Sequence, residues 1–150
     1  MTYHYANIPE CIYSTRPQRI YDAAALAPQP YDVILVLVND YRYGGCTAGA
    51  AVAAMSSDGY GPATLAHEFG HAFGRMADEY VRNPPAHYAG EEPDYPNVTI
   101  QTERPLIKWN AWIPEGIPLP TIDSAQGFPA GLYEGGLTYQ TGIFRSTYTS

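Results

Sequence analysis

Two histidines separated by three residues constrain this 150-residue chain more than any other feature. They belong to the run His67-Glu68-Phe69-Gly70-His71. On a helix, His67 and His71 are one turn apart and project to the same side, so one metal ion can bind both imidazoles. Glu68 lies about 100° further round the helix axis, where its carboxylate can reach a metal-bound water. The run therefore predicts a helix with a hydrolytic zinc site, in which His67 and His71 bind the metal and Glu68 is the general base.

Residues on either side of the histidines predict where this helix begins and ends. Pro62 suits a first helical position, and Ser56 to Asp58 provide capping oxygens just upstream. Gly74 is expected to end the helix in a left-handed conformation, because glycine adopts it without steric cost. The predicted helix therefore spans about Pro62 to Phe73.

The apolar residues of this helix predict which side packs against the protein. Leu65, Phe69 and Phe73 recur at i, i+4 and i+8, which indicates an apolar stripe on the side opposite the two histidines. In the alternative interpretation, His67 and His71 only cap or pack on a surface helix. The flanking residues favour the metal site, because Pro62 and Gly74 fit the two ends of a helix that would present both histidines to one metal ion.

Two histidines leave zinc short of ligands, since catalytic sites usually have three protein ligands and an open position for water. If Gly74 reverses the chain, a carboxylate from the next few residues can return beneath the helix. Asp78 is the favoured third ligand and Glu79 is the alternative. The carboxylate that does not bind the metal would cap a turn or pair with Arg75 or Arg82.

The longer string from His67 to Tyr80 resembles the metzincin clan of zinc metallopeptidases. Gly74 stands where that clan has its glycine turn, and the ending Ala77-Asp78-Glu79-Tyr80 is similar to that of the IgA peptidases, or igalysins, within the clan. Most of the clan has its third ligand at the position of Ala77, so this chain departs from the pattern by one or two residues. The resemblance also includes segments 32–39, 43–45, 95–99 and 108–113.

This resemblance implies a zinc-dependent metalloendopeptidase, with Zn²⁺ as cofactor and a protein or peptide as substrate. Peptide bonds would be hydrolysed by a zinc-bound water activated by Glu68. The implied fold is α/β (α+β), a metzincin-like zincin domain with a twisted mixed sheet, an active-site helix and an irregular C-terminal part. The implied location is secreted or in the bacterial cell envelope, although Met1 to Tyr5 lack the charged and apolar regions of a signal peptide.

Two alternative functions stay open at this point. One is an inactive or structural zinc-binding domain that mediates interactions. Glu68 disfavours it, because structural zinc sites have no use for a general base and usually close their fourth position with another ligand. The other is a zinc hydrolase that acts on a non-peptide bond, which the short histidine motif permits and the longer igalysin-like string disfavours.

Metzincins have a methionine turn after the zinc helix, and this chain has its three methionines at Met1, Met55 and Met76. The segment Gly142 to Ser150 resembles the approach to that turn, so we expect the chain to stop just before it. Without the turn, the protein would hold zinc more loosely, because surrounding packing orients metal ligands. We expect one catalytic domain over 1–150, with the sheet and active-site helix in 1–74 and a loop-rich part with the third ligand in 75–150.

The pattern of apolar residues predicts the elements before the histidine helix. Residues 16 to 27 indicate a helix, and Asp32 to Asn39 indicate a strand buried on both faces because its apolar run is uninterrupted. Thr47 to Met55 indicate a second strand near the sheet edge. By resemblance, segment 44–55 would bind extended substrate by strand addition, with Gly44 and Gly45 as substrate-binding candidates; the alternative is an ordinary loop and strand. After Tyr80, frequent prolines predict loops and short strands.

Composition excludes several classes of protein. A formal net charge of −7, with only eight basic residues, gives no electrostatic reason to bind nucleic acid. No apolar run reaches the roughly 20 residues that a membrane-spanning helix needs. The two cysteines, Cys11 and Cys46, permit one disulfide and are otherwise small buried residues. Nothing in the pattern predicts an oligomeric state.

Overall fold

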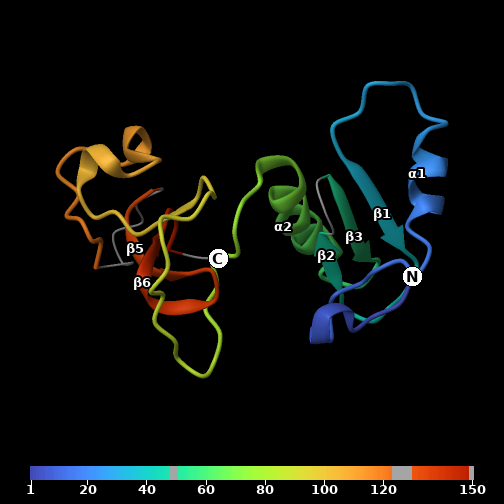
Figure 1. Ribbon diagram of the computed structural model, residues 1–150, viewed down its shortest axis with the longest axis horizontal. Coiled ribbons are helices and arrows are strands. Elements are labelled where there is room, and N and C mark those ends of the chain that lie inside the picture. Colours follow the sequence, from blue (N-terminus) through green and yellow to red (C-terminus); the bar gives the residue numbers. More distant parts are fainter. Residues whose placement is uncertain (48–50, 123–129, 149–150) are drawn as a thin grey trace. The chain divides into compact units, whose positions relative to one another are not determined.

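The computed structural model describes residues 1–47, 51–122 and 130–148, which form two compact units, Met1–Arg75 and Met76–Ser150. Each unit has one three-stranded sheet, and both α-helices belong to the first (Figure 1). The described residues form no barrel, and the predicted α+β class is confirmed. The elements are α1 (Gln18–Ala24), β1 (Ile34–Val38), β2 (Gly45–Thr47), β3 (Val52–Ser56), α2 (Gly61–Gly74), β4 (Val98–Thr99), β5 (Tyr133–Gly136) and β6 (Tyr139–Arg145), with 3-10 turns at Tyr5–Asn7, Arg104–Leu106 and Asn110–Trp112.

The sheet of the N-terminal unit is mixed, as predicted. Its strand order is β1-β3-β2, with β1 parallel and β2 antiparallel to β3. The strand predicted over 32–39 is confirmed as β1. The single strand predicted from Thr47 to Met55 is wrong, because β2 ends at Thr47 and β3 begins at Val52; residues 48–50 lie outside the described residues. The central strand, β3, is buried along its whole length.

The prediction that β1 is buried on both faces is wrong. Leu35 and Leu37 are 48% and 70% exposed, whereas Ile34, Val36 and Val38 are partly buried. β1 is an outer strand of the described sheet. Burial alternates along it, so its apolar run is covered mainly on one face. An uninterrupted run shows that a strand can be buried on both faces, but its neighbours in the fold decide whether it is.

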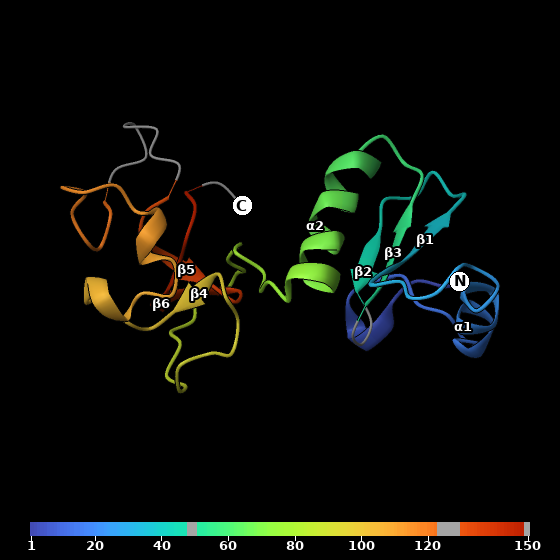
Figure 2. The same cartoon turned by 90° about the horizontal axis from the view of Figure 1, so that it is seen from above.

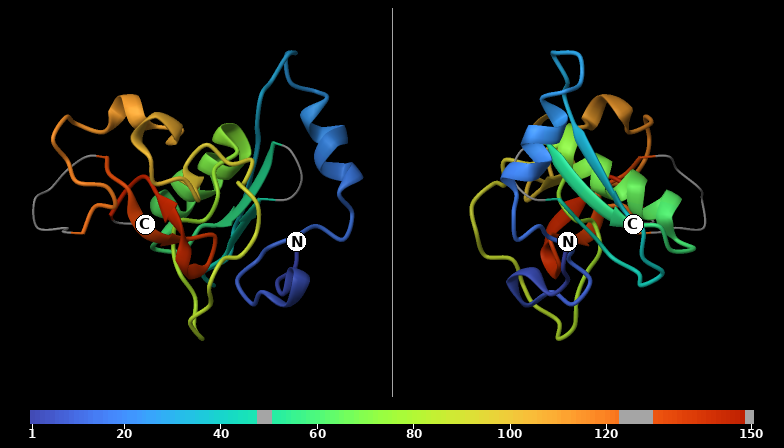
Figure 3. Two further views of the ribbon diagram at one scale, coloured as in Figure 1. Left: turned by 60° about the vertical axis from the view of Figure 1, so that its left-hand side comes forward. Right: turned by 90° about the vertical axis from the view of Figure 1, so that its right-hand side faces the viewer.

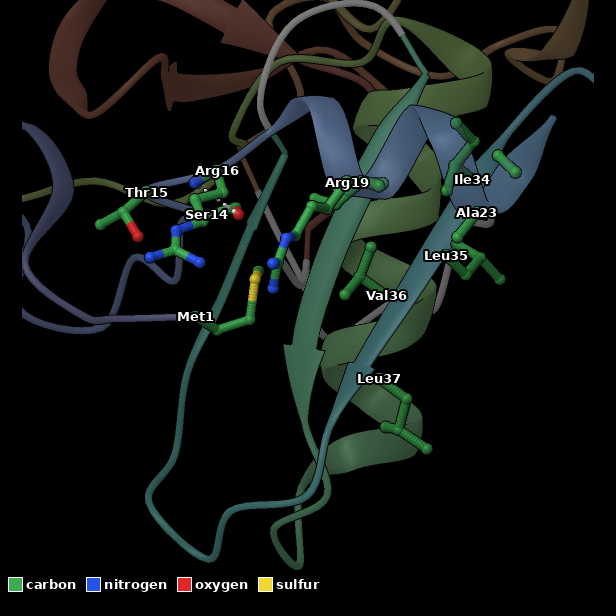
Figure 4. Close-up of a pocket in the computed structure, with 12 residues that line it drawn as sticks. Met1, Ser14, Thr15, Arg16, Arg19, Ala23, Ile34, Leu35, Val36 and Leu37 are labelled. Carbon is green, nitrogen blue, oxygen red and sulfur yellow. Dashed lines mark hydrogen bonds between the residues drawn. The ribbon is translucent and has the colours of Figure 1, made fainter.

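The first helix, α1, lies on the opposite side of this sheet from α2 (Figures 2 and 3). It is shorter than the predicted 16–27 and has no buried residue. A cavity of about 600 Å³ is lined by α1, β1 and the segment before α1. Figure 4 shows Arg16 and Arg19 at this cavity together with Leu35 and Leu37 of β1. None of its lining residues belongs to α2.

The histidine-bearing helix, α2, includes the predicted span and has Pro62 in its first turn. Asp58 precedes it and accepts a hydrogen bond from the Tyr60 N–H at 2.7 Å. The predicted left-handed end at Gly74 is wrong by one residue. Gly74 is still helical, and Arg75 has the left-handed conformation, with φ 52° and ψ 34°. The Arg75 N–H donates to the His71 carbonyl at 3.1 Å, which closes the last turn.

The packed side of α2 differs from the prediction. Leu65, Phe69 and Phe73 are 37%, 41% and 61% exposed, and the buried residues of the helix are Thr64 and Glu68. The reason lies in β2, because a Cβ at Gly45 would stand 2.5 Å from Thr64 Cγ2 and 2.8 Å from Glu68 Oε1. The glycine lets the Thr64 and Glu68 side of α2 approach the strand closely.

The C-terminal unit consists of loops and short strands, as predicted after Tyr80. Its sheet has the order β4-β6-β5, and both pairings are antiparallel. Trp109 anchors the unit, since its indole N–H donates to the Gly131 carbonyl at 2.7 Å. The main core cluster contains Ile107, Trp109, Ile113, Ile117, Leu132 and Phe144. A second cluster of Ala77, Val98 and Ile143 packs beside the start of the unit.

Cys11 and Cys46 form a disulfide, with their Cα atoms 4.8 Å apart. Of the two outcomes that the sequence left open, the bridge is therefore the one observed. It ties the N-terminal segment to β2, where the Gly45 N–H also donates to the Glu10 carbonyl at 3.1 Å. Among the described residues, no helix has both the length and the apolar character needed to cross a membrane.

Candidate metal centre

His67 and His71 meet on one side of α2. Their Nε2 atoms are 3.0 Å apart, and the two rings stand edge to face with centroids separated by 4.5 Å. His67 is exposed and His71 is half-buried. Two nitrogens bound to one tetrahedral zinc at 2.0–2.1 Å would be separated by about 3.3 Å. The observed pair therefore fits a shared zinc ion with little change of side-chain position.

Glu68 lies on a different side of α2 from the histidines and is only 6% exposed. Thr47 of β2 donates its hydroxyl to Glu68, with Oγ1 lying 2.7 Å from Oε2 and 3.0 Å from the Glu68 carbonyl oxygen. The carboxylate thus lies between the helix and the edge strand rather than in open solvent. One turn of α2 presents two imidazoles and, beside them, a carboxylate held by the sheet.

Asp78 joins the two histidines as a potential ligand. One ligand atom from each of His67, His71 and Asp78 lies within 4.8 Å of the other two. The Asp78 carbonyl accepts a hydrogen bond from the Leu137 N–H at 2.8 Å, which fixes the backbone there. Burial raises the pKa of the neighbouring Tyr80 phenol, and the negative charge of Asp78 acts in the same direction. Two nitrogens and one carboxylate oxygen form a set of ligands suited to catalytic zinc.

Glu79, the alternative third ligand, is engaged within the C-terminal unit. Its Oε1 accepts hydrogen bonds from Asn97 Nδ2 and Ser146 Oγ, both at 3.0 Å, and its Oε2 accepts one from Thr147 Oγ1. Asn97 also forms two hydrogen bonds with the backbone of Ala77, at 2.8 and 2.9 Å. These contacts give the Glu79 carboxylate a structural role within the C-terminal unit.

The substrate-binding candidates, Gly44 and Gly45, lie at the start of β2. The Gly44 carbonyl accepts hydrogen bonds from Ser56 N and Oγ at 2.9 and 3.1 Å, and the Gly45 N–H donates to Glu10. These backbone groups are therefore already bonded within the N-terminal unit. β2 itself lies at the edge of its sheet, whereas Val52 to Met55 of the predicted edge strand belong to the central strand β3.

Two residues at this site were not predicted from the sequence to act there. Thr47 bonds the carboxylate of Glu68, and Asn97 orients Ala77 and Glu79. Thr47 follows Gly45 at a spacing of two, which places both residues on one face of a strand. That alternation was the available signal, but the strand that contains it is only three residues long.

Together these features describe an α+β domain whose helix presents paired histidines and a buried glutamate, the residue set of a metal-dependent hydrolase. The model of the IgA peptidase M64 family matches residues 1–131. The chain therefore belongs to this family of metallopeptidases, which makes it a peptidase, and the resemblance seen in the sequence is confirmed. No curated protein matches the sequence.

Proposed function

We propose that the chain is a zinc-dependent metalloendopeptidase in which His67, His71 and Asp78 bind the zinc ion. The observation that supports this most is the grouping of the three ligand atoms within 4.8 Å, in a chain that belongs to a metallopeptidase family. The same grouping favours Asp78 over Glu79 as third ligand, because the Glu79 carboxylate accepts three hydrogen bonds from its own unit.

When bound, zinc supplies a Lewis acid that polarises the scissile carbonyl and lowers the pKa of water to about 7. Glu68 takes one proton from the attacking water as the new C–O bond forms. It then gives that proton to the amine nitrogen as the C–N bond breaks, so one carboxylate is first base and then acid. The residues that move the proton and bind the metal thus come from one helix and the segment after it.

The substrate we propose is a protein or peptide in an extended conformation. β2 is an edge strand next to α2, and edge strands bind extended segments by backbone hydrogen bonds. Gly44 and Gly45 stay candidates for this contact. Because the Gly45 N–H already donates to Glu10, pairing at that residue requires the N-terminal segment to move aside.

One observation favours a second function, a domain in which zinc is structural. Glu68 is only 6% exposed and is bonded to Thr47, an arrangement that could also serve stability alone. The two functions make opposite predictions for substitution of Glu68, because a structural carboxylate is not needed for the chemistry.

The decisive experiment compares the unchanged chain with Glu68→Ala and Glu68→Gln on a quenched-fluorescent peptide library with added zinc. We expect all three proteins to bind one zinc ion, with cleavage reduced by at least about 10²-fold in both variants. Glu68→Gln keeps the side-chain shape and so controls for packing. Retained cleavage in a clean variant preparation would refute the proposed mechanism, and zinc binding without cleavage by any of the three would favour the structural function.

A further inference from the structure

We infer that Thr47 is a positioning residue for Glu68. Its hydroxyl fixes the orientation of the carboxylate that moves the proton. This inference rests on the proposed function, in which Glu68 is the general base, and it assigns a role to a residue of β2. Three features of the N-terminal unit support it: the hydrogen bond itself, the space in which the carboxylate lies, and the way β2 is held.

The hydrogen bond is short and protected from water. Thr47 Oγ1 lies 2.7 Å from Glu68 Oε2 and 3.0 Å from the Glu68 carbonyl oxygen. A hydroxyl has one proton, so the closer and charged oxygen is its stronger acceptor. Thr47 is half-buried and Glu68 is 6% exposed, which limits competition from water for this bond. The bond therefore selects one rotation of the carboxylate.

The space around the carboxylate is matched to it by Gly45. Because side chains alternate along a strand, residues 45 and 47 share one face of β2. A Cβ at Gly45 would stand 2.8 Å from Glu68 Oε1 and 3.2 Å from Glu68 Cγ. One residue of β2 thus leaves room for the glutamate while the next residue on that face donates to it. Gly45 therefore lets Glu68 lie against the strand, and Thr47 bonds its carboxylate there.

The strand that presents Thr47 is anchored on its other face and along its length. Cys46, between the two residues, is bridged to Cys11. Thr47 pairs with Ala53 of the buried central strand in the antiparallel register of β2 and β3. The hydroxyl donor is therefore held by a rigid element. Misplacement of a reacting group by about 1 Å can lower a rate about 100-fold, so such anchoring bears directly on catalysis.

The test uses the full chain with Thr47→Val, which has nearly the same shape and no hydroxyl, and Thr47→Ser, which keeps the hydroxyl. On one peptide cleaved by the unchanged chain, we expect Thr47→Val to lower kcat roughly 10- to 100-fold. KM and zinc content should change less than about twofold, and Thr47→Ser should keep most of kcat. A kcat for Thr47→Val within a factor of two of the parent, or failure of Thr47→Ser to restore it, would overturn the inference.

A thermal unfolding cycle separates this inference from the proposed function. A hydrogen bond to a charged group corresponds to a loss of roughly 3–6 °C in Tm for a chain of this size. We expect Thr47→Val to cause such a loss in the parent and less than half of it in a Glu68→Ala background. Thr47→Ala provides a second variant without the hydroxyl if valine cannot be packed. If the unchanged chain cleaves no peptide, the proposed function fails, and equal Tm losses in the two backgrounds would still overturn the contact on which the inference depends.

Discussion

At the scale of single residues, the proposed metal ligands and the proposed general base have different surroundings. His67 is exposed and His71 half-buried, where a metal and a substrate can reach them, whereas Glu68 is buried against β2. The relative directions of these three side chains follow from local helix geometry, because positions i and i+4 share a side and position i+1 is turned about 100°. This is the part of the site for which sequence spacing is sufficient.

The two acidic residues that follow α2 provide a sharp test of the third ligand. We expect Asp78→Asn to weaken zinc affinity by more than about 100-fold, because the loss removes a charged ligand rather than a supporting group. We expect Glu79→Gln to keep zinc affinity within about tenfold and to lower stability by about 1–3 kcal/mol, since it weakens bonds from Asn97, Ser146 and Thr147. Zinc competition against a chelating dye measures the first effect, and thermal unfolding the second.

The two variants, Asp78→Asn and Glu79→Gln, can support either residue as the third ligand. If Glu79→Gln loses zinc and Asp78→Asn retains it, the third ligand is Glu79 and the proposed assignment is wrong. If both variants retain zinc, the metal is bound by the histidines with a group from elsewhere. Circular dichroism on both variants shows whether the fold is intact before these outcomes are compared.

At the scale of elements, the fit between α2 and β2 determines where Glu68 lies. The sequence predicted that the apolar residues of α2 would pack, yet Thr64 and Glu68 are the buried ones. Hydrophobic periodicity gives no weight to a threonine and a glutamate on a packed face. The glycine at the start of β2 explains the difference, because it removes the side chain that would keep α2 away.

This fit predicts the effect of one added methyl group. Gly45→Ala would place a Cβ 2.5 Å from Thr64 Cγ2, so we expect a loss of stability of about 1–3 kcal/mol and lower peptidase activity. Gly59→Ala is the control, because no atom lies within 4 Å of a Cβ there. Chemical denaturation of both variants measures the difference. Equal stability of the two variants would show that α2 and β2 can separate without cost.

At the scale of the whole molecule, the sequence predicted more of the fold than of its packing. The α+β class, β1, both helices and the loop-rich character after Tyr80 follow from local patterns of apolar residues, glycine and proline. The exposure of Leu35 and Leu37 could not be predicted, because it depends on which elements lie beside β1. The disulfide could not be predicted either, because spacing alone does not show that Cys11 and Cys46 meet.

The same contrast applies to the candidate site. Its histidines and proposed general base lie in one continuous run, whereas Thr47 and Asn97 reach Glu68 and Glu79 from distant positions in the chain. Spacing in a sequence describes only neighbours on one element. Contacts between elements need the fold, so the residues that orient a site are the ones that sequence patterns miss.

The loop-rich unit Met76–Ser150 is expected to lose stability in acid through Glu92. Its carboxylate accepts hydrogen bonds from Thr99 Oγ1 at 3.0 Å and the Ile100 N–H at 2.9 Å, and lies 2.7 Å from Lys108 Nζ. Burial acts to raise the pKa of Glu92, but the bonds from Lys108, Ile100 and Thr99 outweigh it and lower the pKa from its ordinary value of 4.5. A group whose pKa is lowered by folding stabilises the protein above its unfolded pKa. That contribution is lost as the pH falls through the lower, folded pKa.

Glu92→Gln therefore should lower the Tm of this unit at pH 7, and the difference from the parent should shrink as the pH falls below about 4.5. Both tryptophans of the chain lie in this unit, so tryptophan fluorescence follows its unfolding selectively. Glu91→Gln removes the same charge from an exposed neighbour and controls for the net charge of the acidic chain. A Tm difference for Glu92→Gln that stays constant from pH 7 to pH 3, or that Glu91→Gln reproduces, would show that general charge and not the bonded carboxylate stabilises the loop around Lys108.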